Sequence, residues 1–119
     1  MTLTKLVNVK VKFIRPKYKN LKEWMADPNN IYIGRGRVVF IDGKRFPEND
    51  SIFANPFKID SENSRDKVIE KYREYIIKKL GENLRTELEK LVGCNLGCWC
   101  YPEMCHGNVL LDLISKLVA

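Results

Sequence analysis

The sequence has no glutamine, one histidine and no apolar run long enough to cross a membrane. A bilayer-spanning helix needs about 20 consecutive apolar residues. Lys5, Lys10 and Lys12 also interrupt the apolar residues at the N-terminus, so we expect neither a membrane anchor nor a signal peptide. No internal repeat or low-complexity tract is present. With 45% hydrophobic and 30% charged residues, the 119-residue chain lies outside the disordered class, and we expect one domain over residues 1–119.

Cysteine is scarce but clustered. Three of the four cysteines and the only histidine lie between Cys98 and His106. Thiolate and imidazole are the side chains best suited to bind a soft metal ion or to act as nucleophile and base near neutral pH. We expect a cytoplasmic protein, in which stable disulfides are rare, so metal ligation or a reactive thiol is favoured. The absence of glutamine, with abundant Lys, Ile and Glu, is compatible with a thermophilic organism. Because intracellular proteins of hyperthermophiles can contain disulfides, a disulfide stays open as an alternative.

The first interpretation of the cluster is a zinc site. Residues two apart in a strand share a face, so Cys98 and Cys100 would place their sulfurs side by side, with Trp99 on the opposite face. Cys105 and His106 return from a short loop and would complete a Cys₃His set. Zinc is the one cofactor that the sequence indicates.

The second interpretation is an anion pocket with a reactive thiol. Cys105 precedes the last helical pattern, where unpaired N–H groups and the helix dipole lower a thiol pKa and attract phosphate. His106 is suited to act as a general base, and Gly107 lets a substrate approach the backbone. The predicted catalytic residues are Cys105, His106 and Cys100. A purely structural interpretation also stays open, with cysteines as small core residues, and it is the one we favour for Cys94.

The positive charge is concentrated in the N-terminal half. Residues 1–58 carry twelve Lys/Arg against five Asp/Glu, a net +7, whereas residues 59–119 carry nine against ten, a net −1. This asymmetry fits a nucleotide or nucleic-acid partner, and equally a solvated basic surface. Gly34 and Arg35 follow a predicted strand, where a phosphate would be held. Asn55 offers an amide to the polar edge of a ligand.

Hydrophobic periodicity predicts an α/β fold with a mostly parallel sheet. The final strand, loop and helix form a Rossmann-like unit, in which ligands gather beyond the carboxyl ends of the strands. The predicted strands are Leu6–Phe13, Ile31–Ile33, Val38–Ile41 and Leu96–Cys100. The predicted helices are Leu21–Met25, Ser64–Leu80, Asn83–Val92 and Val109–Leu117, with Ser64 and Asn83 as N-caps and Gly81 at the end of the second helix. Asp42-Gly43 predicts a tight turn after Ile41, and a loop is expected over Lys44–Lys58.

The order of several short motifs resembles an uncharacterised family, a domain of unknown function found in bacteria, their phages and other DNA viruses. The motifs are Ile31-Tyr32-Ile33-Gly34-Arg35, Asn55-Pro56-Phe57, the helical segment Val68–Tyr75, Leu96-Gly97-Cys98-Trp99-Cys100, and Pro102 with Cys105-His106-Gly107. The resemblance runs from about Ile31 to Leu113. It implies a viral or prokaryotic protein, and host-cell cytoplasm if viral, but no established activity. The chain departs from the pattern in an insertion around Val38–Asn49 and in Asn108, where an acidic residue is typical.

The favoured hypothesis is a ligand site that binds or processes a nucleotide, a nucleobase or a nucleic-acid end. Arg35 would hold phosphate, Asn55 the polar edge of the ligand, and Cys105 or His106 the reacting centre, with Gly34 and Gly107 as further ligand-binding residues. The alternative is a nucleic-acid-binding module without catalysis, in which Cys98, Cys100, Cys105 and His106 hold zinc. A structural or host-factor-binding viral protein is a third class. Whether Arg35 faces the cysteine loop, and the oligomeric state, are left open.

Overall fold

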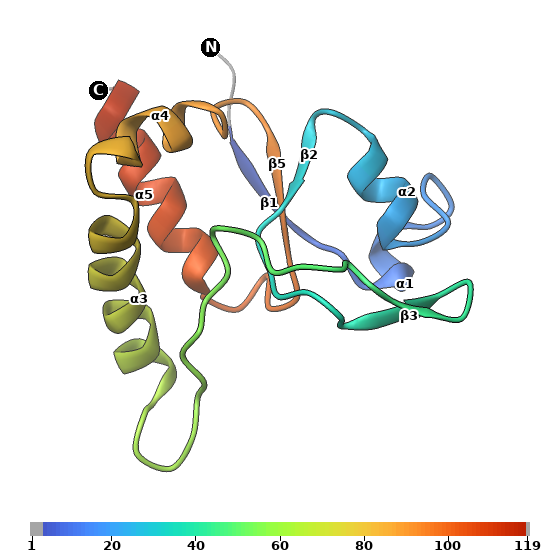
Figure 1. Cartoon of the computed structure of the whole chain (residues 1–119), viewed down its shortest axis with the longest axis horizontal. Helices are drawn as coiled ribbons and strands as arrows, with labels where there is room; N and C mark the ends of the chain where they lie inside the picture. The colour runs from blue at the N-terminus through green and yellow to red at the C-terminus, as the bar shows by residue number, and fades with distance from the viewer. Residues whose placement is uncertain (1–3, 119) are drawn as a thin grey trace.

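Three parallel strands form the centre of the computed structural model, which describes residues 4–118. Strand β5 (Asn95–Cys98) lies between β1 (Lys5–Asn8) and β2 (Asn30–Tyr32), so the spatial order is β1-β5-β2. In this register Leu96 of β5 lies opposite both Leu6 and Ile31. The predicted parallel sheet is confirmed, and all three strands end at the same edge (Figure 1).

Helices cover both faces of this sheet, so the fold has three layers (Figure 1). One face carries α3 (Arg65–Leu80), α4 (Leu84–Glu89) and α5 (His106–Val118), which pack with Leu96 and Cys98 in the larger apolar cluster. The other face carries the short helices α1 (Val11–Ile14) and α2 (Leu21–Ala26), which pack around Trp24. Within the described part of the chain, no helix combines the length and apolarity needed to cross a membrane.

Of the predicted helices, the one over Ser64–Leu80 follows its sequence signals and the one over Asn83–Val92 does not. Ser64 caps α3 as predicted, because its side chain accepts the Lys67 N–H. Asn83 does not cap α4: it lies in helical backbone within a 3₁₀ turn, η1 (Gly81–Asn83), and its side chain makes no capping bond. Helix α4 is also shorter than the predicted Asn83–Val92.

The first predicted strand, Leu6–Phe13, is wrong in its second half. The Asn8 side chain accepts the Lys10 N–H at 3.0 Å, a local turn that ends β1. The chain then forms α1, which buries Ile14 but leaves Phe13 more than half exposed. The alternation of apolar and polar residues therefore continues through Val9 and Val11 although the strand has already ended.

A hairpin replaces the first part of the predicted loop Lys44–Lys58. Strands β3 (Val39–Ile41) and β4 (Lys44–Phe46) pair antiparallel. Asp42 and Gly43 connect them with φ of 52° and 77°, the left-handed pair that a two-residue hairpin requires. The Asp-Gly turn was recognised in the sequence, but the strand after it was missed because β4 is short and mostly exposed.

Candidate functional site

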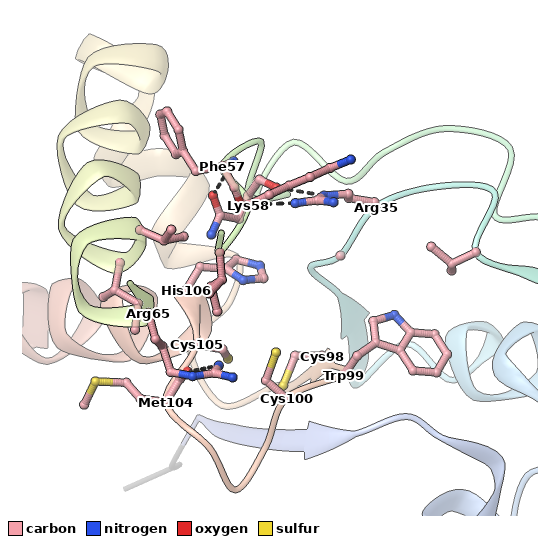
Figure 2. A pocket seen from close by; sticks show the side chains of 16 residues that line it. Arg35, Phe57, Lys58, Arg65, Cys98, Trp99, Cys100, Met104, Cys105 and His106 are labelled. Carbon is pink, nitrogen blue, oxygen red and sulfur yellow. Dashed lines mark hydrogen bonds between the residues drawn. The ribbon is translucent and has the colours of Figure 1, made fainter. Parts of the chain in front are cut away.

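A cavity of about 380 Å³ opens at the carboxyl edge of the sheet, between the ends of β2 and β5 (Figure 2). Four segments of the chain line it, contributed by residues 34–38, 55–59, 65–69 and 98–106. This volume lies within the range of small-molecule sites. Of the residues predicted from the sequence, the cavity brings together Gly34, Arg35, Asn55, Cys98, Cys100, Cys105 and His106.

The cysteine loop begins where β5 ends. The strand stops at Cys98 and not at the predicted Cys100, because the Cys100 carbonyl accepts the Glu103 N–H and turns the chain. Cys98 is buried and Cys100 is exposed, although both line the cavity. Trp99 turns to the opposite face as predicted and packs against the cluster around Trp24.

Cys98 and Cys105 form a buried thiol pair. The neighbouring Cys105 thiol and the backbone N–H groups of Tyr101 and Cys100 favour the thiolate of Cys98. Their effect outweighs burial and lowers the pKa of Cys98 to about 6. The neighbouring Cys98 sulfur, together with burial, raises the pKa of Cys105. The helix start was expected to lower the pKa of Cys105; the direction is the reverse, and Cys98 is the more acidic thiol.

His106 begins α5, and its imidazole points into the cavity (Figure 2). Its Nε2 lies 2.8 Å from the Ile33 carbonyl oxygen. Since a carbonyl can only accept, Nε2 carries the proton and Nδ1 presents a lone pair. Burial, and then the nearby positive charge of Arg35, lower the pKa of His106, while the Ile33 bond raises it. The imidazole is therefore neutral near pH 7 and is suited to accept a proton.

Gly34 and Arg35 are held against the cysteine loop by a chain of hydrogen bonds. The Trp99 indole N–H donates to the Tyr32 hydroxyl at 2.8 Å, and that hydroxyl donates to the Arg35 carbonyl at 2.7 Å. A Cβ on Gly34 would lie 2.4 Å from the Tyr32 hydroxyl oxygen, so this position needs glycine. The Gly-Arg bend therefore faces the cysteine loop.

The Arg35 side chain orders the opposite rim of the cavity. Its Nε donates to the Asn55 carbonyl at 2.9 Å and its Nη2 to the Phe57 carbonyl at 3.2 Å. The guanidinium has five N–H bonds, so Nη1 and one hydrogen of Nη2 are left for a ligand. The Asn55 side-chain oxygen accepts the Phe57 N–H at 2.9 Å, which leaves its amide NH₂ as the group that can contact a ligand.

Two cations of the site were missed in the sequence. Lys58 and Arg65 line the same cavity as Arg35, and among the described lining residues none is Asp or Glu. Arg65 pairs with Glu103 at 2.7 Å and donates to the Met104 carbonyl at 2.9 Å, which ties α3 to the cysteine loop. No motif marks either residue, because α3 and the 55–59 segment meet the cavity only through tertiary packing.

Two predicted residues lie elsewhere. Gly107 is not among the residues that line the cavity; a Cβ there would lie 2.5 Å from Leu6 and 3.1 Å from Ile33, so this glycine lets α5 pack closely on the sheet. Cys94 lies at the other end of β5, and its thiol contacts the Lys90 carbonyl at 3.6 Å. The structural interpretation of Cys94 agrees with this position.

The predicted zinc ligands line one cavity but are not arranged around a common point. Among residues 4–118, no group of three or more His, Cys, Asp or Glu side chains is arranged to hold a metal ion. The Cys98 and Cys105 thiols are free and lie near each other, and Nε2 of His106 is hydrogen-bonded to the Ile33 carbonyl. The structure therefore places Cys98, Cys100, Cys105 and His106 on one cavity wall without forming a tetrahedral donor set.

The fold and the cavity define a small mixed α/β protein with a thiol- and histidine-lined pocket at the carboxyl edge of its parallel sheet. The chain belongs to the family described as Domain of unknown function (DUF4326), whose model matches residues 17–116. This agrees with the expected membership of an uncharacterised family.

Two viral proteins are similar to the chain. It is 35% identical over 109 residues to the "Uncharacterized protein R718" of Acanthamoeba polyphaga mimivirus, covering 85% of this chain and 78% of that protein. It is 36% identical over 56 residues to the "Uncharacterized 12.4 kDa protein in nrdA-td intergenic region" of Enterobacteria phage T4, covering 45% of this chain and 52% of that protein. No solved structure matches the chain significantly.

Proposed function

We propose that the cavity binds a nucleotide, either free or at the end of a nucleic-acid strand. One observation carries this proposal: a single cavity whose described lining residues include no Asp or Glu combines the cations Arg35, Lys58 and Arg65 with apolar and aromatic side chains. Arg65 is paired with Glu103, whereas Arg35 and Lys58 make no ion pair with a described residue and favour a phosphate group. The apolar residues fit a planar base, and they are Val38, Phe57, Ile59, Val68, Ile69, Trp99 and Met104.

The order of elements supports the same ligand. In parallel α/β sheets, ligands bind beyond the carboxyl ends of the strands, and anions favour helix N-termini. Strand β5, the cysteine loop and α5 follow one another in this order, and His106 lies at the helix start. Arg35 and His106 line the same cavity, and the Arg35 charge contributes to lowering the pKa of His106.

The same cavity carries groups that can act on a bound nucleotide. Cys98 supplies an acidic thiol, and neutral His106 supplies a proton acceptor. Cys105 serves this chemistry by favouring the thiolate of its neighbour Cys98, and Cys100 offers the exposed thiol of the loop. We assign the reacting centre to this group, with Cys98 in the nucleophilic position in place of the expected Cys105.

The binding test uses isothermal titration calorimetry with a nucleoside monophosphate, the matching nucleoside, ribose 5-phosphate and inorganic phosphate. We expect the monophosphate to bind more tightly than each fragment, because only it fills both the cationic and the apolar parts. Lys58→Ala should weaken monophosphate binding about tenfold, the effect of one hydrogen bond to a charged group.

Lys78→Ala is the matched control, since Lys78 is an exposed lysine of α3 that does not line the cavity. Equal affinity for the monophosphate and inorganic phosphate would contradict a base-binding cavity. Equal weakening by Lys58→Ala and Lys78→Ala would contradict the location of the site.

A further inference from the structure

A second groove, of about 490 Å³, lies on the other side of Trp99 from the cavity. The β3–β4 hairpin borders it on one side, and α1, α2 and the segment between them border it on the other. Trp99 lines both the groove and the cavity. Val38 lines the cavity, and the next residue, Val39, lines the groove. The two hollows are therefore neighbours that meet at Trp99.

The groove has the charge of a polyanion site. Lys10, Arg15 and Lys19 line it, against one acidic residue, Asp42. All of its lining residues except Trp99 lie within residues 1–58, the half of the chain with a net charge of +7. Neither Lys10 nor Lys19 makes a side-chain ion pair with another described residue, so both ammonium groups are available to phosphates.

The groove also presents apolar and aromatic surface. Val9 and Leu21 in its lining are buried and Trp99 is partly buried, whereas Val11 is 45% and Phe40 66% exposed. The Arg45 guanidinium lies over the Phe40 ring, 4.7 Å from its centroid, so a cation covers one face of this exposed ring. Exposed aromatic rings between cations are the surface on which unpaired bases stack.

We propose that this groove binds a single-stranded polynucleotide and leads its terminal nucleotide past Trp99 into the cavity. The second half of this inference rests on the proposed function. A single strand fits because its bases can reach a concave apolar surface while its phosphates meet the surrounding lysines. The bases of a duplex are stacked inside the helix and cannot enter such a groove.

Fluorescence anisotropy with a labelled oligothymidylate and a labelled oligouridylate, each of about 12 nucleotides, tests the proposal and distinguishes DNA from RNA. We expect binding that weakens as salt rises from about 50 to 300 mM. Phe40→Ala should weaken binding at least about fivefold through lost stacking. Lys10→Ala/Lys19→Ala should reduce the slope of log affinity against log salt by about 1.4, or about 0.7 per phosphate contact.

Lys67→Ala/Lys78→Ala is the matched control, because it removes two exposed lysines of α3 that line neither hollow. If the control pair weakens strand binding equally, the strand is held by general charge attraction, and the proposal that it binds in the groove is overturned. Tighter binding of a duplex, or displacement of the strand by an oligoglutamate peptide at equal charge, would overturn the single-stranded partner.

The two proposals fail separately. Phe40→Ala should leave monophosphate binding unchanged, and Lys58→Ala should weaken monophosphate binding while a strand still binds the groove. If the monophosphate binds but no strand does, only the proposal for the groove fails. If a strand binds but the monophosphate does not, the proposal that the cavity receives the end of the strand fails.

Discussion

At the scale of single residues, His106 offers the simplest test of the site. The chain has one histidine, so the carbon-bound ring protons of a tag-free protein report a single titration by NMR. We expect its midpoint below the ordinary value of 6.5, because burial and the Arg35 charge disfavour the imidazolium. Arg35→Met should raise the midpoint, whereas Arg85→Met, a matched charge change on α4, should not. A midpoint at or above 6.5 would contradict the buried, neutral imidazole.

The Cys98–Cys105 pair predicts a pH-dependent stability. In the unfolded chain both thiols titrate near 9; in the folded protein Cys98 loses its proton near pH 6, and the pKa of Cys105 is raised. Between about pH 7 and 9 the unfolded state therefore binds one proton more. The free energy of unfolding should rise with pH by up to about 1.4 kcal/mol per unit, and should fall above pH 9.

Urea unfolding at a series of pH values measures this dependence. Cys98→Ser should remove most of the slope, since a hydroxyl does not titrate in this range. Cys94→Ser is the control, because Cys94 lies outside the pair, and it should keep the slope. An unchanged slope in Cys98→Ser would show that the pair does not carry the effect.

At the scale of elements, β5 fits only because Gly97 has no side chain. A Cβ there would lie 2.6 Å from the Trp24 ring and 2.7 Å from Val9. Gly97→Ala should therefore lower the free energy of unfolding by about 1–3 kcal/mol, measured by urea denaturation. Because Val9→Ala removes one of the two collisions, the double variant should lose less than the sum of the two single variants. Additive losses would contradict the close contact.

Short elements were the ones that the sequence pattern misassigned. Helix α3 was predicted with its cap, because sixteen residues repeat the helical period and Ser64 supplies the N-cap. Strand β4 has three residues and helix α1 has four, too few for a period to emerge. Their conformations follow from local turns, at Asp42-Gly43 and at Asn8, and from what they pack against.

At the scale of the whole molecule, the two proposed sites are formed by different parts of the sequence, and these parts differ in net charge. The groove is built mainly from residues 9–42, within the basic half, and the cavity draws on both halves through residues 34–59 and 65–106. Trp99 joins them, because the sheet places the end of β5 between the ends of β1 and β2. A basic half and a cysteine loop that are far apart in sequence thereby share one surface.

The sequence alone determined the α/β class, the parallel sheet, the caps of α3 and the location of the cysteine loop. These features follow from the spacing of residue types along the sequence, which is evident before the fold is known. Only the tertiary structure decided that Arg35, Lys58 and Arg65 meet at one cavity, that Cys98 is more acidic than Cys105, and that the four predicted zinc ligands share a cavity wall without forming a metal-binding group. Such features depend on burial and on contacts between distant segments, and neither is encoded in the spacing of any one motif.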